Sequence, residues 1–205
     1  VVRAAAEDAA AAAEIARSNA ILGQAPNKHI AQEAEETAYK AYQAAIEAYE
    51  EIGDNYLSMR EYDKAKKALK HALKLNPTSP NALYLLGFLY SSLGDFDRSI
   101  ETLETANRVQ PHHPEILRCL GWSVFHGGER KRGLVILERA KAMAPQDTLI
   151  ICDLAVCYLN DREFDRTIEL LDHALQIDPS NEKAKDCLET AKFFKTEFSK
   201  LKKSK

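Results

Sequence analysis

The chain has 205 residues, a formal net charge of −3, and contents of 45% hydrophobic and 29% charged residues. These proportions are ordinary for a soluble globular protein, and the small net charge gives no general attraction to nucleic acid or anionic membranes. No run approaches the roughly 18 apolar residues of a membrane span, so membrane insertion is not expected. The four cysteines show no CxxC spacing. They favour a reducing, cytoplasmic setting over a disulfide framework.

Residues 1–45 form an alanine-rich N-terminal extension. Its composition and its early acidic residues predict one helix up to Leu22. The segment "GQAPN" then breaks the pattern, because glycine and proline interrupt helices. A second, long helix is expected to begin near His29 and to continue into the next segment.

From residue 46 the sequence repeats with a period of 34 residues. Prolines recur at Pro77, Pro111, Pro145 and Pro179. In the same frame an alanine stands five residues before each proline and a leucine eight residues before it. The position 24 residues before each proline is small and holds Gly53, Gly87, Gly121 and Ala155. A fixed period in four consecutive units, 46–79, 80–113, 114–147 and 148–181, indicates a repeat architecture.

Each unit is predicted to be a helix, a turn and a helix. In the unit 80–113 the apolar stripe of the first helix consists of Leu83, Leu86, Gly87 and Tyr90, at helical spacing. Gly94 in "LGDF" suits a tight turn. A second helix follows and stops at Pro111, because proline cannot extend it. One such hairpin cannot cover its own apolar face, so neighbouring hairpins are expected to stack.

The recurring Leu-Gly-x-x-Tyr, Ala and Pro positions resemble the tetratricopeptide repeat (TPR) family. This resemblance implies an all-α, right-handed superhelical solenoid in which the first helices line a concave inner wall. The third unit departs from the pattern, with Arg130 in place of an aromatic residue and Gly133 inside the second helix. Because glycine costs a helix interior about 1 kcal/mol relative to alanine, this unit is expected to pack less well.

Residues 182–205 are predicted to form a C-terminal capping helix with a lysine-rich end. A cap of this kind closes the open end of a repeat stack. The apolar stripe of this predicted helix comprises Ala184, Leu188, Ala191, Phe194, Phe198 and Leu201. The lysines are interpreted as a solvated face, and the alternative is a basic tail that contacts membrane or nucleic acid.

The family's packing implies which side chains of the first helices face the concave groove. The candidate peptide-binding residues are Tyr84, Phe88, Arg118, Trp122, Phe125, Cys152, Val156 and Leu159. In the first unit the groove is expected to be acidic, through Glu47, Glu50 and Asp54. Surplus apolar surface of this kind marks binding sites, and tryptophan and arginine often dominate interface energetics. Leu149 is a further groove-facing position of the fourth unit. The alternative is that some side chains of this row, such as Tyr84 and Leu149, pack between adjacent first helices.

No catalytic, cofactor or metal motif stands out. Glycine-rich phosphate loops, HExxH and GxSxG are absent, and His112 and His113 have no evident further metal ligands. The family's clamp for acidic chaperone tails is also missing, because its positions hold Glu50, Asp54, Leu85, Glu115 and Cys119.

The sequence therefore predicts a non-catalytic protein–protein interaction module that binds an extended or helical peptide, as a chaperone or an assembly scaffold. The alternative is a self-assembling scaffold whose groove is filled by the helix of residues 1–22 or by a second copy of the chain. A homo-oligomer remains possible in either case.

Overall fold

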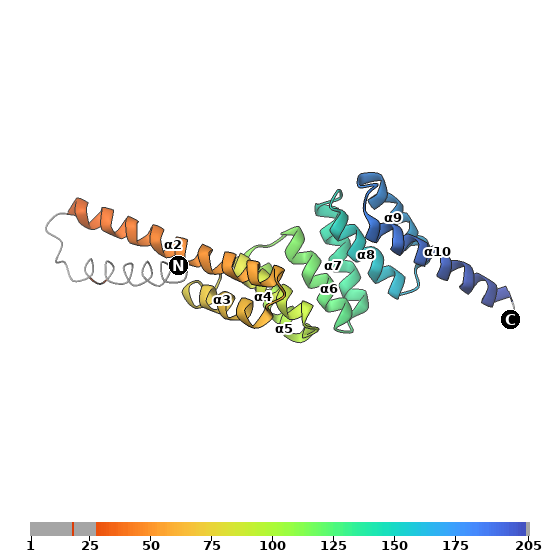
Figure 1. Cartoon of the computed structure of the whole chain (residues 1–205), viewed down its shortest axis with the longest axis horizontal. Helices are drawn as coiled ribbons and strands as arrows, with labels where there is room; N and C mark the ends of the chain where they lie inside the picture. The colour runs from red at the N-terminus through yellow and green to blue at the C-terminus, as the bar shows by residue number, and fades with distance from the viewer. Residues whose placement is uncertain (1–17, 19–27, 204–205) are drawn as a thin grey trace. The chain divides into compact units, whose positions relative to one another are not determined.

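The computed structural model describes Ser18 and residues 28–203, with side chains described at Ser18 and over residues 36–201. All regular elements in this described part are α-helices, so the fold is an all-α helical repeat solenoid (Figure 1). The helices are α2 (Lys28–Ser58), α3 (Tyr62–Leu75), α4 (Pro80–Ser92), α5 (Phe96–Val109), α6 (Pro114–His126), α7 (Arg130–Met143), α8 (Thr148–Asn160), α9 (Phe164–Ile177) and α10 (Glu182–Lys203). The helix predicted for residues 1–22 lies outside the described residues.

The chain divides into two compact units, residues 1–89 and 90–205, and the boundary falls inside α4. In the first unit α2 packs against α3 over a small core of Ala45, Ile46, Tyr49, Ala72 and Ala82. The two helices approach closely at Gly53, where a Cβ would lie 2.6 Å from Cδ2 of Leu69. This approach explains the small residue in that column of the repeat.

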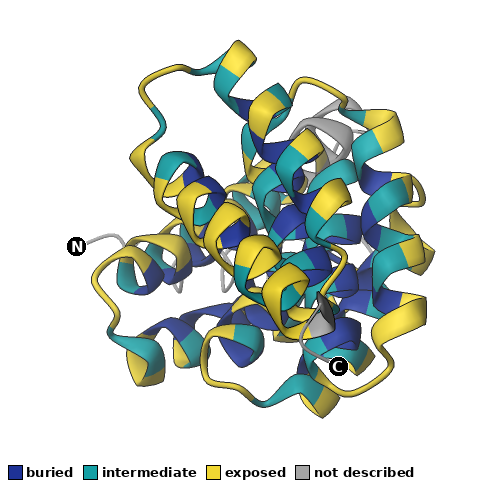
Figure 2. Cartoon of the chain, turned by 90° about the vertical axis from the view of Figure 1, so that its right-hand side faces the viewer, coloured by how far each residue is buried: buried dark blue, intermediate teal, exposed yellow. Residues whose placement is uncertain are grey.

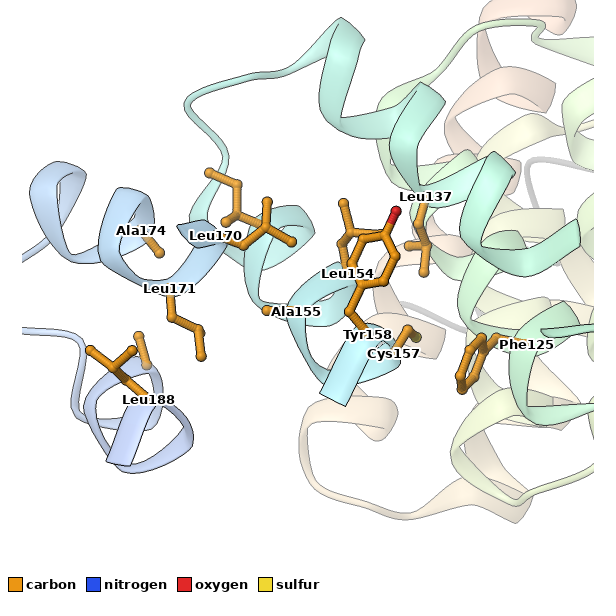
Figure 3. Close-up of a cluster of buried hydrophobic side chains, with 12 residues drawn as sticks. Phe125, Leu137, Leu154, Ala155, Cys157, Tyr158, Leu170, Leu171, Ala174 and Leu188 are labelled. Atoms are coloured by element: carbon orange, nitrogen blue, oxygen red, sulfur yellow. The ribbon is translucent and has the colours of Figure 1, made fainter. Parts of the chain in front are cut away.

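In the second unit the helices pair as α6 with α7 and α8 with α9, and α10 packs on α9. Buried residues lie where the helices pack on one another (Figure 2). The second helices α7 and α9 also carry exposed residues, whereas every residue of α6 is buried or half-buried. The core drawn in Figure 3 joins side chains from five helices. Its members are Phe125, Leu137, Ile151, Leu154, Ala155, Cys157, Tyr158, Leu170, Leu171, Ala174, Ala184 and Leu188.

The turn inside each hairpin contains a residue with a positive φ, and these residues recur at 34-residue intervals. Arg60, Gly94, Gly128 and Arg162 have φ values of 58°, 75°, 109° and 62°. At each turn the next amide donates to a carbonyl five residues back, as Asp95 does to Tyr90 at 2.9 Å. Such left-handed residues end helices in Schellman motifs, and glycine adopts them most readily. The turn expected at Gly94 is therefore present, and two arginines adopt the same conformation.

The interpretation of Gly133 as a packing defect was wrong. A Cβ built on Gly133 would lie 2.6 Å from the backbone nitrogen of Phe125 and 2.7 Å from the carbonyl oxygen of Gly121. Gly121 and Gly133 therefore let the backbones of α6 and α7 come closer than any larger pair of residues would allow. The same column holds the buried residues Ala65, Ser99 and Thr167 in the other hairpins. Glycine at 133 is the extreme of a small-residue column at a helix crossing.

Candidate peptide-binding surface

Glu50 does not provide a free acidic group, in contrast to the expectation for the first unit. Its side chain is buried, and it accepts hydrogen bonds from the hydroxyl of Ser79 and from Nδ2 of Asn81, the latter at 2.9 Å. Ser79 Oγ also accepts from the amide of Ala82 at 3.2 Å, so it caps α4. Glu50 therefore ties α2 to the start of α4, and only Glu47 and Asp54 of the expected acidic group are exposed.

The two aromatic candidates on α4 lie one helical turn apart. Phe88 is exposed and Tyr84 is half-buried. Residues four apart share one face of a helix, so the two rings form a small aromatic patch within the first unit.

Phe125 was expected to face the groove, and the structure contradicts this. Its side chain is only 2% exposed and belongs to the core of the second unit. Gly133 leaves room for the backbone and Cβ of Phe125 at the crossing of α6 and α7, and Leu154 and Cys157 of α8 belong to the core that covers its ring. Phe125 therefore stabilises the packing of α6 and is removed from the candidate surface.

Trp122 is half-buried and packs against the edge of the same core. Its ring centroid lies 4.3 Å from that of His126, whose imidazole also stacks on Phe96 at 5.8 Å. Burial lowers the pKa of His126, and the positive charge of Arg130 lowers it further. Because the imidazole is then neutral near pH 7, Trp122 has an uncharged aromatic neighbour.

Arg118 is half-buried and forms an ion pair across two helices. Its Nη1 donates to Oδ2 of Asp153 in α8 at 2.8 Å. Burial nevertheless raises the pKa of Asp153, and this effect exceeds the opposing effect of Arg118. The guanidinium is therefore already engaged within the protein, whereas the sequence interpretation had it free for a ligand.

The candidates on α8 form a continuous apolar face at helical spacing. Leu149 is 60% exposed, and Cys152, Val156 and Leu159 are half-buried. Burial raises the pKa of the Cys152 thiol to about 11. The thiol is therefore protonated at neutral pH and behaves as a small apolar group.

We call the set Arg118, Trp122, Leu149, Cys152, Val156 and Leu159 the α6–α8 surface. Trp122 and Cys152 pack on one core, and the Arg118–Asp153 pair joins the two helices. Sequence reasoning missed Asp153, although a signal was available. The equivalent positions one and two repeats earlier hold Cys119 and Leu85, both buried, so a carboxylate in this column requires a partner.

The described residues show no sign of a metal centre or a membrane-spanning helix. Among them no group of three or more His, Cys, Asp and Glu side chains is arranged to hold a metal ion. None of the helices α2 to α10, as far as they are described, combines the length and apolarity that a span requires.

Comparisons with known proteins agree with the repeat architecture. A family model for the tetratricopeptide repeat matches residues 56–121. No curated protein matches the sequence at a significant level.

Similar solved structures include MamA, with 26% identity, coverage of 71% of this chain and 85% of that chain, and a TM-score of 0.60. TTC0263, a thermophilic TPR protein of Thermus thermophilus, has 18% identity, coverage of 87% and 99%, and a TM-score of 0.67. YrrB, a TPR protein with an unusual peptide-binding site, has 19% identity, coverage of 86% and 89%, and a TM-score of 0.60. The 34-residue frame, the paired helices and the match over residues 56–121 show that this chain has the tetratricopeptide repeat architecture.

Proposed function

We propose that this protein is a non-catalytic interaction module that binds an extended or helical peptide of a partner protein through the α6–α8 surface. The observation that carries the proposal is the row of exposed and half-buried apolar side chains on α6 and α8. These side chains lie beside a core that is already closed by Phe125, Leu154 and Cys157. Apolar surface beyond what a core needs is typical of a binding site.

The chemistry of the surface defines the peptide. Trp122 offers a large, partly fixed aromatic face, and Leu149 offers an exposed aliphatic group. Large apolar side chains of the ligand would therefore be buried here, as is typical of interface centres. The polar groups of Arg118 and Asp153 already satisfy each other, so the ligand needs no charge at that point. The exposed acids Glu47 and Asp54 and the aromatic pair Tyr84 and Phe88 are proposed as a separate contact surface within the first unit.

The wider setting that we propose is a cytoplasmic chaperone or assembly scaffold. Within the described part of the chain, no disulfide joins Cys119, Cys152, Cys157 or Cys187. Free, largely buried thiols are most common in reducing compartments. YrrB supports the peptide-binding role by analogy, since its structure is described as having a peptide-binding site.

The experiment starts from peptides selected on the purified protein from a displayed library of random sequences. Selected peptides should be rich in apolar residues and should change the fluorescence of Trp122, the only tryptophan in the sequence. Trp122→Ala and Leu149→Ala should each weaken binding by about 2 kcal/mol if the residues are anchors. The affinity of the Phe88→Ala variant for the same peptides tests separately whether the first unit contributes to binding.

Val135→Ala is the matched control. Val135 is 70% exposed on the second helix α7, so its removal deletes an exposed apolar side chain without touching the surface. Circular dichroism would verify that each variant keeps its helix content. Affinities that are equal for Leu149→Ala, Trp122→Ala and the control would exclude the α6–α8 surface. A ligand-free protein whose Trp122 emission changes with its own concentration would instead favour self-assembly through this surface.

A further inference from the structure

The second half of α10 exposes large apolar side chains on one helix. Phe193, Phe194 and Leu201 are 61%, 43% and 62% exposed. By contrast, Ala184, Leu188 and Ala191 in the first half of α10 are buried. Phe198 is half-buried against Phe164, with ring centroids 5.4 Å apart. The capping function of α10 therefore uses its inner face and leaves an outer apolar face, which we call the α10 face and define as Phe193, Phe194 and Leu201.

The repeat frame shows how unusual this exposure is. Phe193 stands 68 residues, two repeats, after Phe125. Phe125 is 2% exposed because α8 of the following repeat contributes Leu154 and Cys157 to the core around it. At Phe193 the equivalent side chain has no such cover within the described chain. Exposed apolar side chains of this kind, here two phenylalanines and a leucine, are typical of a surface that binds a membrane or another molecule.

The charge around the α10 face indicates which class of partner it binds. Residues 192–203 carry five lysines and one glutamate, a net charge of +4, whereas the whole chain has a net charge of −3. Two of the lysines are engaged in the protein, Lys195 with Asp165 at 2.5 Å and Lys200 with Glu197 at 2.8 Å. The Lys200 pair also neutralises Glu197, the only acid of the segment. The local charge is thus strongly positive on a chain that is otherwise acidic.

The lysines lie on a different side of α10 from Phe194 and Leu201. Phe194 and Leu201 are seven residues apart and share one side of the helix, and Lys192, Lys195 and Lys200 are each about 100° or more away from both. Glu197 lies between Phe193 and Leu201 around the helix, where Lys200 neutralises its charge. An apolar side and a basic side on one helix are typical of helices that lie flat in the headgroup region of anionic bilayers. Lysines outside the two ion pairs can then reach the phosphates while the rings enter the acyl boundary.

We propose that the α10 face docks this protein on anionic lipid surfaces, as a peripheral contact through one amphipathic helix. A second copy of the chain is a poorer fit, because it would bring two basic segments together. Nucleic acid is also a poorer fit, because Phe194 and Leu201 would point away from a strand held by the lysines. The proposal is independent of the peptide-binding function, since it uses none of the residues of the α6–α8 surface.

The test is sedimentation of the full chain with vesicles of pure phosphatidylcholine and of equal parts phosphatidylcholine and phosphatidylserine. Binding is expected only to the mixed vesicles, and added salt should weaken it. F193S together with F194S should reduce the partition coefficient roughly tenfold or more, because both rings lose their insertion. Lys192→Gln with Lys195→Gln and Lys200→Gln should produce a similar loss. Val135→Ser, an equally exposed apolar residue on α7, should bind like the wild type.

Three results would overturn the proposal. The first is no binding to the mixed vesicles. The second is vesicle binding that F193S/F194S leaves unchanged, which would mean that the lysines alone bind the anionic lipids by nonspecific electrostatic attraction. The third is a concentration-dependent dimer in sedimentation velocity that F193S/F194S abolishes, because the α10 face would then be covered by a second copy. All of these variants change exposed residues, and their thermal unfolding should match that of the wild type.

Discussion

Single residues in this protein are placed in backbone conformations and environments that their own chemistry does not favour. Arg60 and Arg162 adopt the left-handed conformation that Gly94 and Gly128 adopt in the neighbouring hairpins. His126 keeps an imidazole between three aromatic rings, with a buried Nε2 that has no hydrogen-bond partner among the described residues. Each of these residues gives a measurable consequence for stability.

Arg60→Gly should raise the free energy of unfolding by roughly 0.5–1 kcal/mol. The substitution removes the cost of a left-handed β-carbon, and the greater freedom of glycine in the unfolded chain offsets part of that gain. Urea denaturation followed by circular dichroism measures the change. Lys67→Gly, in the middle of α3, is the control and should lose about 1 kcal/mol. A loss at Arg60 comparable with that at Lys67 would contradict the conformational argument.

His126 should make the stability of the second unit depend on pH. Burial and Arg130 lower its pKa in the folded protein, with Asp153 acting in the opposite direction. The unfolded chain therefore binds a proton more readily than the folded chain, and stability falls as the pH drops below about 6.5. His126→Gln should reduce the difference in melting temperature between pH 7.5 and pH 5.5. An equal difference in both proteins would assign the pH dependence to other groups.

At the scale of the helices, the spacing of small residues decides how closely the two members of a hairpin approach. The sequence predicted the helix pairs, their turns and their small columns, because these follow from a pattern repeated four times. It did not predict that Gly133 belongs to such a column. A single glycine in a helix is expected to lower helix stability, and its packing role is visible only when the residue opposite it on the neighbouring helix is known. The engagement of Glu50 and Arg118 was missed for the same reason. Their partners are Ser79, which precedes α4, Asn81 on α4 and Asp153 on α8.

Gly133→Ala should destabilise the protein by about 1–3 kcal/mol, the range for an overpacked core. Helix propensity alone predicts the opposite, a gain of about 1 kcal/mol. The new methyl group would meet the backbone of Phe125 and Gly121, which cannot move aside as a flexible side chain can. Chemical denaturation decides the sign. Val135→Ala, two residues further along α7 and exposed, should change stability by less than about 0.5 kcal/mol.

Removing one partner of the ion pair between α6 and α8 should lower the stability of the protein more than replacing both partners with apolar residues. Arg118→Met alone should cost about 1–3 kcal/mol, because it leaves the carboxylate of Asp153 half-buried without its partner. Arg118→Met together with Asp153→Leu should return to within about 1 kcal/mol of the wild type, since the column of Asp153 holds Leu85 and Cys119 elsewhere. A double-mutant cycle from urea midpoints measures the coupling. Additive losses in the cycle would show that the two side chains do not depend on each other.

At the scale of the whole chain, charge and function are distributed unevenly along the repeats. The α6–α8 surface is apolar around one satisfied ion pair, whereas residues 192–203 concentrate positive charge at the capping helix. The inner and outer faces of α10 thus have separate roles: the inner face closes the core of the second unit, and the outer face carries the exposed phenylalanines. Separating these roles experimentally requires one change that removes the helix and one that alters only its outer face.

Deletion of residues 182–205 should destabilise the second unit by at least about 3 kcal/mol. It removes Leu188 and uncovers Leu171, and each fully buried side chain of this size contributes about 1.5–3 kcal/mol. The melting temperature should fall, and binding of the dye ANS should rise because core surface becomes exposed. F193S/F194S alters only the outer face, so its melting temperature should equal that of the full chain. Equal stability of the truncated and full chains would mean that the core around Leu171 closes without α10, and that the helix serves its outer face alone.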